Sequence, residues 1–406
     1  MAQIGDAGFI FPEPPVGLRS LWPYRPRFRD DELLTSFLIR VSNGLQLKPI
    51  TFLNAVWGSS RSLLNQDLDS FAPDHVVNRI AQGVDVTAED VRRATLSAYA
   101  ETLILNYNII GRNSWVLPTT VKSNDRRRRG LQFCPACLAS DEAPYFRRGW
   151  RLAFATICTR HGTLLRDSCP ECGDVIHPHR SPSIQHCFRC GHTLCVPTAV
   201  AARHDHIAWQ ASLERGLLLG WISLGTEFER SHVVFAIVRQ LAALLVNGKR
   251  AKTLRETTAR ILGGDPSPFD KPTSRQPIEY LRHAERHRLF DLVQRLVNGW
   301  PYLFVHVCEE AGLHRSHAIK DMPSPPFAYE SVVRSYMDRT PYFANEREVA
   351  AAAAWLRRTT GRASYADLKA ICGESRAAIY KHMDYVRRRE NPSQWRLRAL
   401  ASLNDL

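Results

Sequence analysis

The first strong pattern in the chain is a helical spacing of apolar residues, which follows a proline-rich segment over residues 1–29. Residues three or four positions apart line one face of a helix, and here they are Leu33, Leu34, Phe37, Leu38 and Val41. Asn43 and Gly44 predict the end of this helix, and Pro49 predicts the start of the next. Two short helices joined by a glycine-bearing turn are typical of a helix-turn-helix.

Three carboxylates, Asp30, Asp31 and Glu32, precede the first of these helices. Acidic residues at a helix start interact favourably with its dipole, so we expect that role here. Helices are expected to continue over residues 74–107.

Helical spacing returns after residue 200, over residues 206–225, 231–246, 251–262 and 278–313. Residues 263–277 are rich in proline, glycine and serine and predict a linker. No run approaches the roughly 20 apolar residues of a membrane span, so no membrane partner is expected.

The last part of the chain predicts a second helix-turn-helix. A helix over residues 346–361 precedes one over 365–373, which Ser364 caps and whose Leu368 and Ile371 face inward. Gly373 makes the turn to a recognition helix over residues 375–385.

Basic side chains provide candidate contacts with nucleic acid or with a partner protein. The C-terminal candidates are Arg376, Lys381, His382 and Arg387, although helix pairs of this size also pack against proteins. A second basic run, Arg126, Arg127, Arg128 and Arg129, is either a phosphate or partner contact or a solvated linker.

Composition narrows the class of partner. The chain has 406 residues and a formal net charge of +14, which indicates a polyanion such as DNA. The N-terminus lacks the basic and apolar regions of a secretory signal, so a cytoplasmic location with reduced thiols is expected.

Four close pairs of cysteine and histidine lie between residues 134 and 190. They form two sets of four ligands: Cys134, Cys137, Cys158 and His161, then Cys169, Cys172, Cys187 and Cys190. Two residues between paired ligands let one turn of chain present both to one tetrahedral Zn²⁺. A glycine follows each of three pairs (Gly162, Gly173 and Gly191), where a knuckle turn needs positive φ.

Two structural Zn²⁺ ions per chain are therefore predicted, each four-coordinate and without an open position for catalysis. A disulfide framework is the alternative, and a reducing location opposes it. One of His177, His179, His186, His192 and Cys195 is an alternative ligand in the second set. Cys308 and Cys372 lie in apolar helical surroundings and are expected in the core.

No catalytic pattern accompanies these sites. The chain lacks G-x-x-x-x-G-K-[ST], so we do not expect it to hydrolyse nucleotides or to be an enzyme. A zinc-ribbon nuclease is the catalytic alternative, but it needs an open metal position.

The predicted fold is mainly α, with helix-turn-helix domains at both ends and a central tandem zinc-ribbon or zinc-finger module with short β-hairpins. The predicted domains are 1–125, 126–200, 201–325 and 326–406.

Two segments resemble the TniQ family, which includes the longer TnsD-type target selectors of transposons. One is RPRFRDDELLTSFLIRVSNGL, and the other is FCPACLASDEAPYFRRGWRLAFATICTRHGTLLRDSCPECG, with C-P-x-C, Trp, C-x-x-H-G and C-P-x-C-G in family order. The resemblance covers roughly residues 20–195 and extends more loosely to NGWPYLF and the C-terminal helices.

The resemblance implies a non-catalytic adaptor for transposition in the bacterial cytoplasm, at the nucleoid when engaged. It would link a chosen target to an AAA+ ATPase regulator. The target would be located by a CRISPR Cascade complex with its guide RNA, or read directly in DNA as TnsD-type proteins do. A homodimer is compatible with either mode. A zinc-containing helix-turn-helix transcription regulator is the alternative from another class.

Overall fold

The structure is a computed structural model of the chain, and it divides into two compact units, Met1–Met337 and Asp338–Leu406. It describes residues 21–58, 63, 66–108, 113–119, 130–181, 183–197, 201–270, 277–320, 322–338, 344–373 and 377–382. The described part is mainly helical, with short antiparallel hairpins, as predicted.

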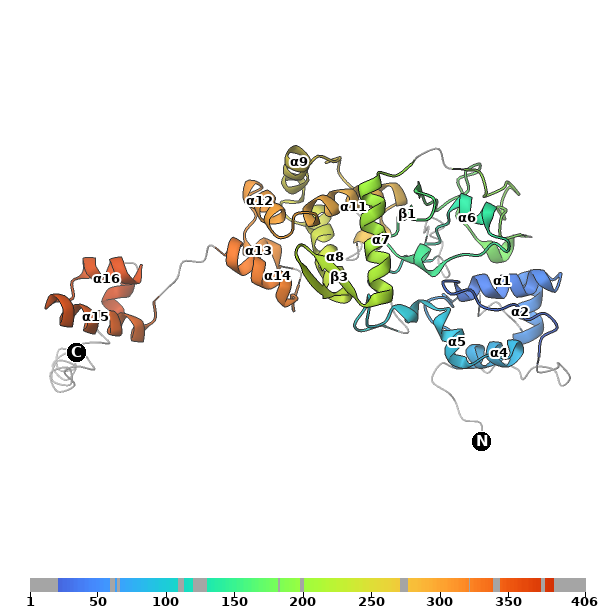
Figure 1. The fold of residues 1–406 in the computed structure, drawn as a ribbon, viewed down its shortest axis with the longest axis horizontal. Coiled ribbons are helices and arrows are strands. Elements are labelled where there is room, and N and C mark those ends of the chain that lie inside the picture. The colour runs from blue at the N-terminus through green and yellow to red at the C-terminus, as the bar shows by residue number, and fades with distance from the viewer. Residues whose placement is uncertain are drawn as a thin grey trace, which may run out of the picture. The chain divides into compact units, whose positions relative to one another are not determined.

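The N-terminal part of the first unit is a set of short helices (Figure 1): α1 Leu34–Gly44, α2 Pro49–Trp57, α4 Asp74–Val84, α5 Ala88–Arg93 and the 3₁₀ helix η1 Leu96–Tyr99. The predicted end of α1 at Gly44 and the predicted start of α2 at Pro49 are both confirmed. The predicted helices over 74–107 extend only to Tyr99, and turns follow. The buried apolar faces of α1, α2, α4 and α5 share one core with Trp22, whereas Leu96 of η1 belongs to the larger core of the unit.

The middle of the unit contains little regular structure. Its elements are α6 Pro135–Ser140, the 3₁₀ helices η2 Arg148–Arg151 and η3 Pro178–Arg180, and the hairpin β1 Ile157–Cys158 with β2 Thr163–Leu164. Single antiparallel bridges, Ser168↔Val175 and His186↔Thr193, close two further turns. A segment with so few ladder bonds depends on other interactions for its stability.

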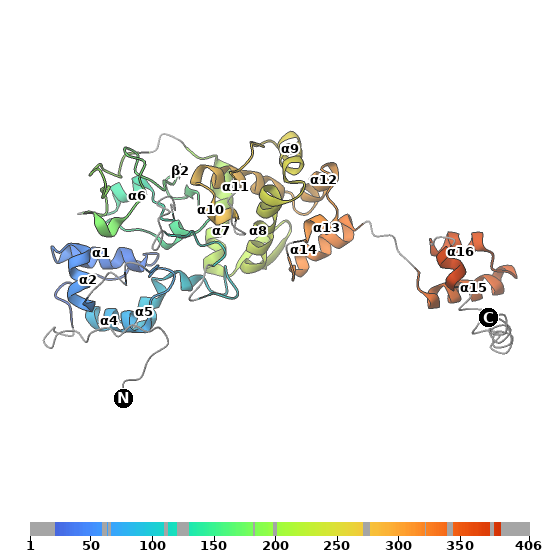
Figure 2. The same ribbon diagram turned by 180° about the vertical axis from the view of Figure 1, so that it is seen from behind.

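The rest of the first unit is a helical body around α8 and α11 (Figures 1 and 2). Its elements are α7 His204–Leu219, β3 Trp221–Leu224, β4 Glu227–Arg230, α8 Ser231–Asn247, α9 Ala251–Leu262, α10 Pro277–Tyr280, α11 His283–Val297, α12 Tyr302–Glu310, α13 Arg315–Ala318, α14 Phe327–Val332 and the π-helical η4 Val333–Met337. A large apolar core joins this body to the middle of the unit.

The predicted helix over residues 206–225 is wrong beyond Leu219. Gly220 adopts a left-handed conformation at φ 78° and ends α7, and Trp221 then begins a strand that pairs with β4. Ile222 and Leu224 are buried while Trp221 and Ser223 are exposed, which is the alternation of a strand with one buried face.

No single helix among the described residues has both the length and the apolar character to cross a membrane. The pair α8 and α9 reaches that length only across a bend of 110°.

The second unit contains α15 Glu346–Thr360 and α16 Tyr365–Cys372, and residues 377–382 are also helical. Ser364 caps α16 as predicted, since its hydroxyl accepts a hydrogen bond from the Asp367 amide. Leu368 is buried, but the predicted inward position of Ile371 is wrong because its side chain is 50% exposed. Cys372, four residues after Leu368, takes the inner position against Ala344 and Val349. The helix-turn-helix motifs predicted in this unit and at the N-terminus stay predictions.

Candidate metal centre

The first predicted ligand set comes together in the structure. Cys134 is the N-cap of α6, and Cys137 lies one turn later. Cys158 ends β1, and His161 lies in the turn that connects β1 to β2. The Sγ atoms of Cys137 and Cys158 are 3.6 Å apart, and Nδ1 of His161 lies 3.3 to 3.6 Å from the three sulfur atoms. All four ligand atoms fall within 4.8 Å of one another.

The second set converges in the same way. Sγ of Cys169 lies 3.7 Å from Sγ of Cys190, and Sγ of Cys172 lies 3.7 Å from Sγ of Cys187. A disulfide needs a sulfur–sulfur distance of about 2.05 Å, so these pairs are thiols rather than disulfides. A tetrahedral zinc ion with Zn–S bonds of about 2.3 Å separates its sulfur ligands by about 3.8 Å. The donor types and their separations therefore fit two tetrahedral metal sites.

Backbone turns hold the ligands in each pair. The amides of Gly162, Gly173 and Gly191 donate to the carbonyls of Cys158, Cys169 and Cys187, at 2.8 to 3.0 Å. These glycines have φ of 65° to 73°, so the predicted need for a left-handed residue after the ligand pair is confirmed.

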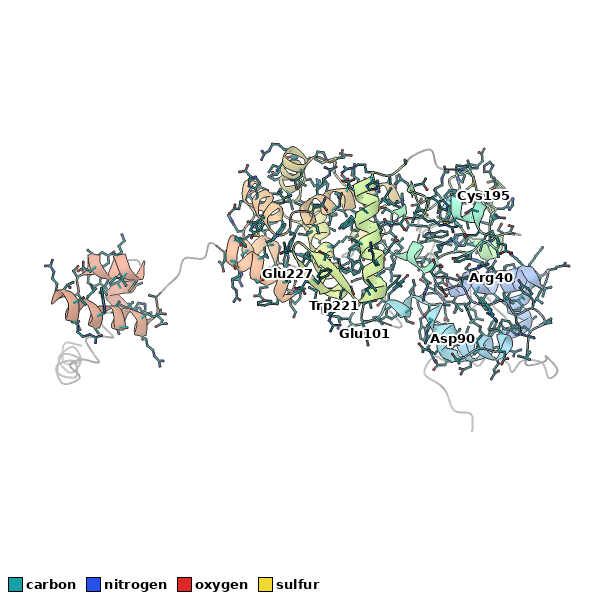
Figure 3. All side chains as sticks on the ribbon, in the orientation of Figure 1. Arg40, Asp90, Glu101, Cys195, Trp221 and Glu227 are labelled. Atoms are coloured by element: carbon teal, nitrogen blue, oxygen red, sulfur yellow. The ribbon has the colours of Figure 1, made fainter. Side chains whose placement is uncertain are left out.

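The alternative ligands stay outside both sets. None of His177, His179, His186, His192 and Cys195 joins the four cysteines of the second set. Figure 3 labels Cys195, a half-buried thiol on the same part of the chain. Cys308 and Cys372 are buried in apolar clusters as expected, and burial raises the pKa of the Cys308 thiol.

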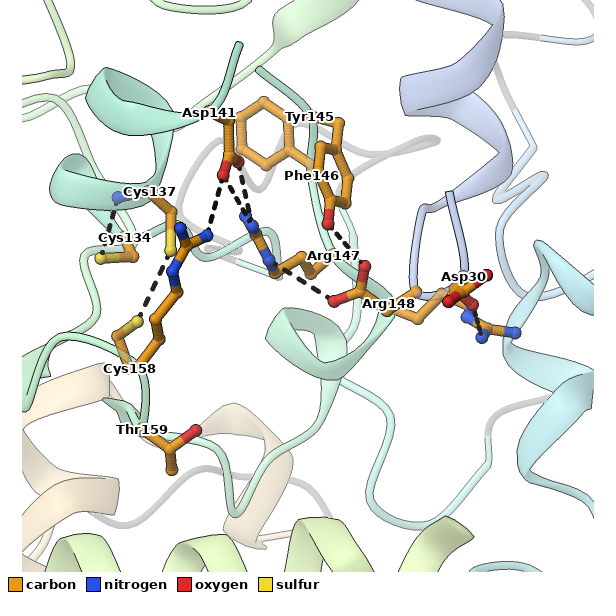
Figure 4. A network of polar contacts seen from close by, with 12 residues as sticks. Asp30, Cys134, Cys137, Asp141, Tyr145, Phe146, Arg147, Arg148, Cys158 and Thr159 are labelled. Atoms are coloured by element: carbon orange, nitrogen blue, oxygen red, sulfur yellow. Dashed lines mark hydrogen bonds and ion pairs between the residues drawn. The ribbon is translucent and has the colours of Figure 1, made fainter. Parts of the chain in front are cut away.

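A salt-bridge network fixes the first metal site to the N-terminal helices (Figure 4). Arg147 binds Asp141, just after α6, at 2.9 Å, and approaches Asp31, before α1, at 3.4 Å. The Tyr145 hydroxyl also donates to Asp31, at 2.8 Å. The Arg147 guanidinium also lies over the rings of Tyr145 and Trp150, and such cation–π contacts are favourable.

A second connection is more deeply buried. The fully buried guanidinium of Arg151 binds Asp67 at 2.6 Å and Asp69 at 3.3 Å, both from the segment before α4. Arg151 lowers the pKa of Asp67, although burial opposes the shift. Burial and the nearby Asp67 carboxylate raise the pKa of Asp69 to about 6, despite hydrogen bonds from Thr35 and the charge of Arg151.

The acidic residues before α1 do not act as the sequence predicted. No acidic side chain lies in the first turn of α1, whose N-cap is Leu33. Glu32 is instead buried and pairs with Arg40, labelled in Figure 3, at 2.7 Å. Glu32 and Asp31 therefore form ion pairs with Arg40 and Arg147, outside the first turn of α1.

The helical body is attached to the opposite side of the metal site. The Gln210 side chain on α7 accepts hydrogen bonds from the amides of Thr156 and Ile157 and donates to the Ile157 carbonyl. Arg286 on α11 is fully buried and donates to the Ala153 carbonyl and to the Gln132 side chain. Burial lowers the pKa of Arg286 to about 10. The first metal site is therefore joined to helices on both sides.

The predicted nucleic-acid or partner contacts are described only in part. Arg126, Arg127, Arg128, Arg129, Arg376 and Arg387 lie outside the described residues. Lys381 is exposed on the helical residues 377–382, whereas His382 is 17% exposed and lies 4.0 Å from Glu346. Their roles in binding nucleic acid or a partner stay predictions.

Sequence reasoning missed Arg147 and Arg151 and their partners. Arg147 and Arg151 sit in the string FRRGWR, which carries no spacing that points to a partner. Asp67 and Asp69 lie more than eighty residues earlier, so only the fold brings the pairs together.

Part of this chain is similar to a known protein family. No curated protein matches the chain. The family model of TniQ matches residues 23–165, a range that contains the N-terminal helices, the first metal site and the arginines that join them. The second metal site lies beyond the matched range. The match therefore identifies a TniQ domain over residues 23–165 of the chain.

Proposed function

We propose that this protein is a non-catalytic adaptor that links a target located by an RNA-guided Cascade complex to an AAA+ ATPase regulator of transposition. The TniQ domain is the observation that carries the proposal, since it implies a transposition-related role in target selection. The particular partners are inferred from that role.

The architecture of the first unit supports an adaptor. Two structural Zn²⁺ ions would hold the segment over residues 134–190, which has few ladder bonds of its own. Arg147 and Arg151 fix this segment to the N-terminal helices, and Gln210 and Arg286 fix it to the helical body. A body whose parts are joined in this way can present two separate surfaces in a constant geometry.

Under this proposal, the AAA+ ATPase regulator hydrolyses ATP. The sequence has no phosphate-binding loop of the Walker type, and each proposed zinc site has four protein ligands. We therefore propose that ATP hydrolysis and DNA cleavage are performed by other chains, and that this chain determines where they act.

A bridging experiment tests the proposal. Tagged Cascade with its guide RNA and target DNA is immobilised, and retention of the ATPase regulator is measured with and without this chain. We expect retention only when the chain is present, and none when Cascade lacks its guide. Retention that is equal without the chain would refute the adaptor.

Direct reading of DNA is the second mode, and the C-terminal unit supports it. α16 ends at Gly373 in a left-handed turn, and Lys381 is exposed on the helical residues that follow. Under this mode the chain alone would bind one DNA sequence far more tightly than unrelated DNA, and Lys381→Gln would weaken that binding. If the chain binds all DNA sequences with equal affinity, direct reading is excluded and the RNA-guided mode is supported. Specific binding to a promoter, with no effect on transposition, would favour the transcription regulator.

A further inference from the structure

Positive charge gathers on the first unit where two distant turns face each other. The turn between α8 and α9 carries Lys249 and Arg250, and the segment after α12 carries His314, His317 and Lys320. We refer to these five residues as the basic cluster. None of them belongs to the metal sites or to the contacts predicted from the sequence.

Packing between the two turns fixes the cluster. Nη1 of Arg250 donates to the Ala311 carbonyl at 3.4 Å, and a Cβ atom at Gly312 would lie only 3.2 Å from that nitrogen. The guanidinium therefore lies against the backbone of the second turn. The His314 amide donates to Nδ1 of His317 at 3.3 Å, and the two rings lie 5.9 Å apart.

The three lysine and arginine side chains of the cluster, Lys249, Arg250 and Lys320, form no ion pair with a described carboxylate. Residues 248–254 and 311–320 contain no Asp or Glu. On α9, which follows the first turn, Lys252 pairs with Glu256 and Arg260 pairs with Glu310.

The positive charges of the cluster also act on the imidazole of His317. Burial and then the positive charges of Arg250, His314, Lys249 and Lys320 lower the pKa of this imidazole. Like charges held together destabilise the folded state. Lys249, Arg250 and Lys320 are also exposed, so core packing does not explain their grouping.

We infer that the basic cluster binds the phosphodiester backbone of a double-stranded nucleic acid. Lysine and arginine donors neutralise phosphates in such contacts and supply affinity without reading the sequence. A protein partner is disfavoured, because protein interfaces centre on large apolar side chains. Among the described residues of 248–254 and 311–320, no large apolar side chain is exposed. This inference goes beyond the adaptor proposal, and either can fail without the other.

A pair of charge-matched variants of the full chain tests the site. Lys249→Gln/Lys320→Gln removes two charges from the cluster, and Lys252→Gln/Arg260→Gln removes two paired charges from α9. Binding of fluorescent duplexes of unrelated sequence, one DNA and one RNA, is measured at several salt concentrations. Circular dichroism melting shows whether each variant is folded.

We expect the cluster variant to reduce the slope of log affinity against log salt for duplex DNA by about 1.8, since each lost phosphate contact contributes about 0.9. The control should keep the wild-type slope. A loss with only one of the two duplexes identifies DNA or RNA as the source of the phosphates. An unchanged slope with both duplexes, or an equal loss in the control, would overturn the inference, and the cluster would then be a surface for an acidic protein.

Discussion

At the scale of single residues, the spacing in the sequence predicted the two four-residue clusters that could hold metal ions. Short-range spacing determines which side chains one turn presents to an ion, and both sets converge as the spacing indicated. The pairing of Arg147 with Asp31 and of Arg151 with Asp67 could not be predicted, because only the tertiary fold brings these distant segments together.

Zinc content is the first test at this scale. We expect two zinc ions per wild-type chain and one in Cys137→Ser, because the first site would lose a thiolate ligand. Elemental analysis of the purified full chain measures this. Cys195→Ser, which changes a thiol outside both sets, is the control and should retain two ions. Two ions in Cys137→Ser would contradict the assignment.

Loss of Arg151 should destabilise the first unit. Arg151→Met leaves Asp67 and Asp69 without their buried partner, and breaking a buried ion pair costs about 3–5 kcal/mol. Urea unfolding measures the change. Arg92→Met, which removes an exposed pair with Asp74, should cost no more than about 1 kcal/mol. Similar losses in both variants would show that the buried pairing is unimportant.

The carboxyl of Asp69 should make stability depend on pH. Its pKa is raised to about 6, so the folded protein binds this proton more tightly than the unfolded chain. The contribution is fully present below the unfolded pKa of about 3.9 and is lost as pH rises through about 6. Asp69→Asn cannot titrate. The unfolding free energy of wild type minus that of Asp69→Asn should therefore fall between pH 4.5 and 7. If this difference in unfolding free energy rises with pH instead, the pKa of Asp69 is not raised in the folded protein.

At the scale of elements, helix ends with a local chemical cause were predicted well. The structure confirms the end of α1 at Gly44, the start of α2 at Pro49 and the Ser364 cap of α16. The hairpin of β3 and β4 was missed because Trp221–Leu224 continues an apolar helical pattern. The glycine at 220 and the alternation after it were the available signals.

The Ser364 cap provides a test at this scale. Ser364→Ala removes the acceptor for the Asp367 amide, and loss of such a cap costs about 1 kcal/mol. Hydrogen exchange of the α16 amides in the full chain should therefore become faster. Ser364→Asp restores an acceptor oxygen and should keep the slow exchange. Equal acceleration in both variants would exclude capping as the cause.

At the scale of the whole molecule, the family-model match over residues 23–165 supports the resemblance to the TniQ family. The predicted helical class and the short hairpins are also confirmed. Sequence patterns could not reveal that one apolar core joins the middle of the chain to the helical body. That core depends on contacts between distant segments. The predicted boundaries at residues 125, 200 and 325 stay predictions.

The central claim is that this chain directs a transposon to its target without catalysing the reaction. The most direct measurement is sequencing of insertion sites in reconstituted transposition, with the transposase, the ATPase regulator and the guided complex present, and with or without this chain. We predict that insertions gather beside the guided target only when the chain is present, while cleavage of the transposon ends persists without it. The same distribution of insertions in its absence would contradict the claim.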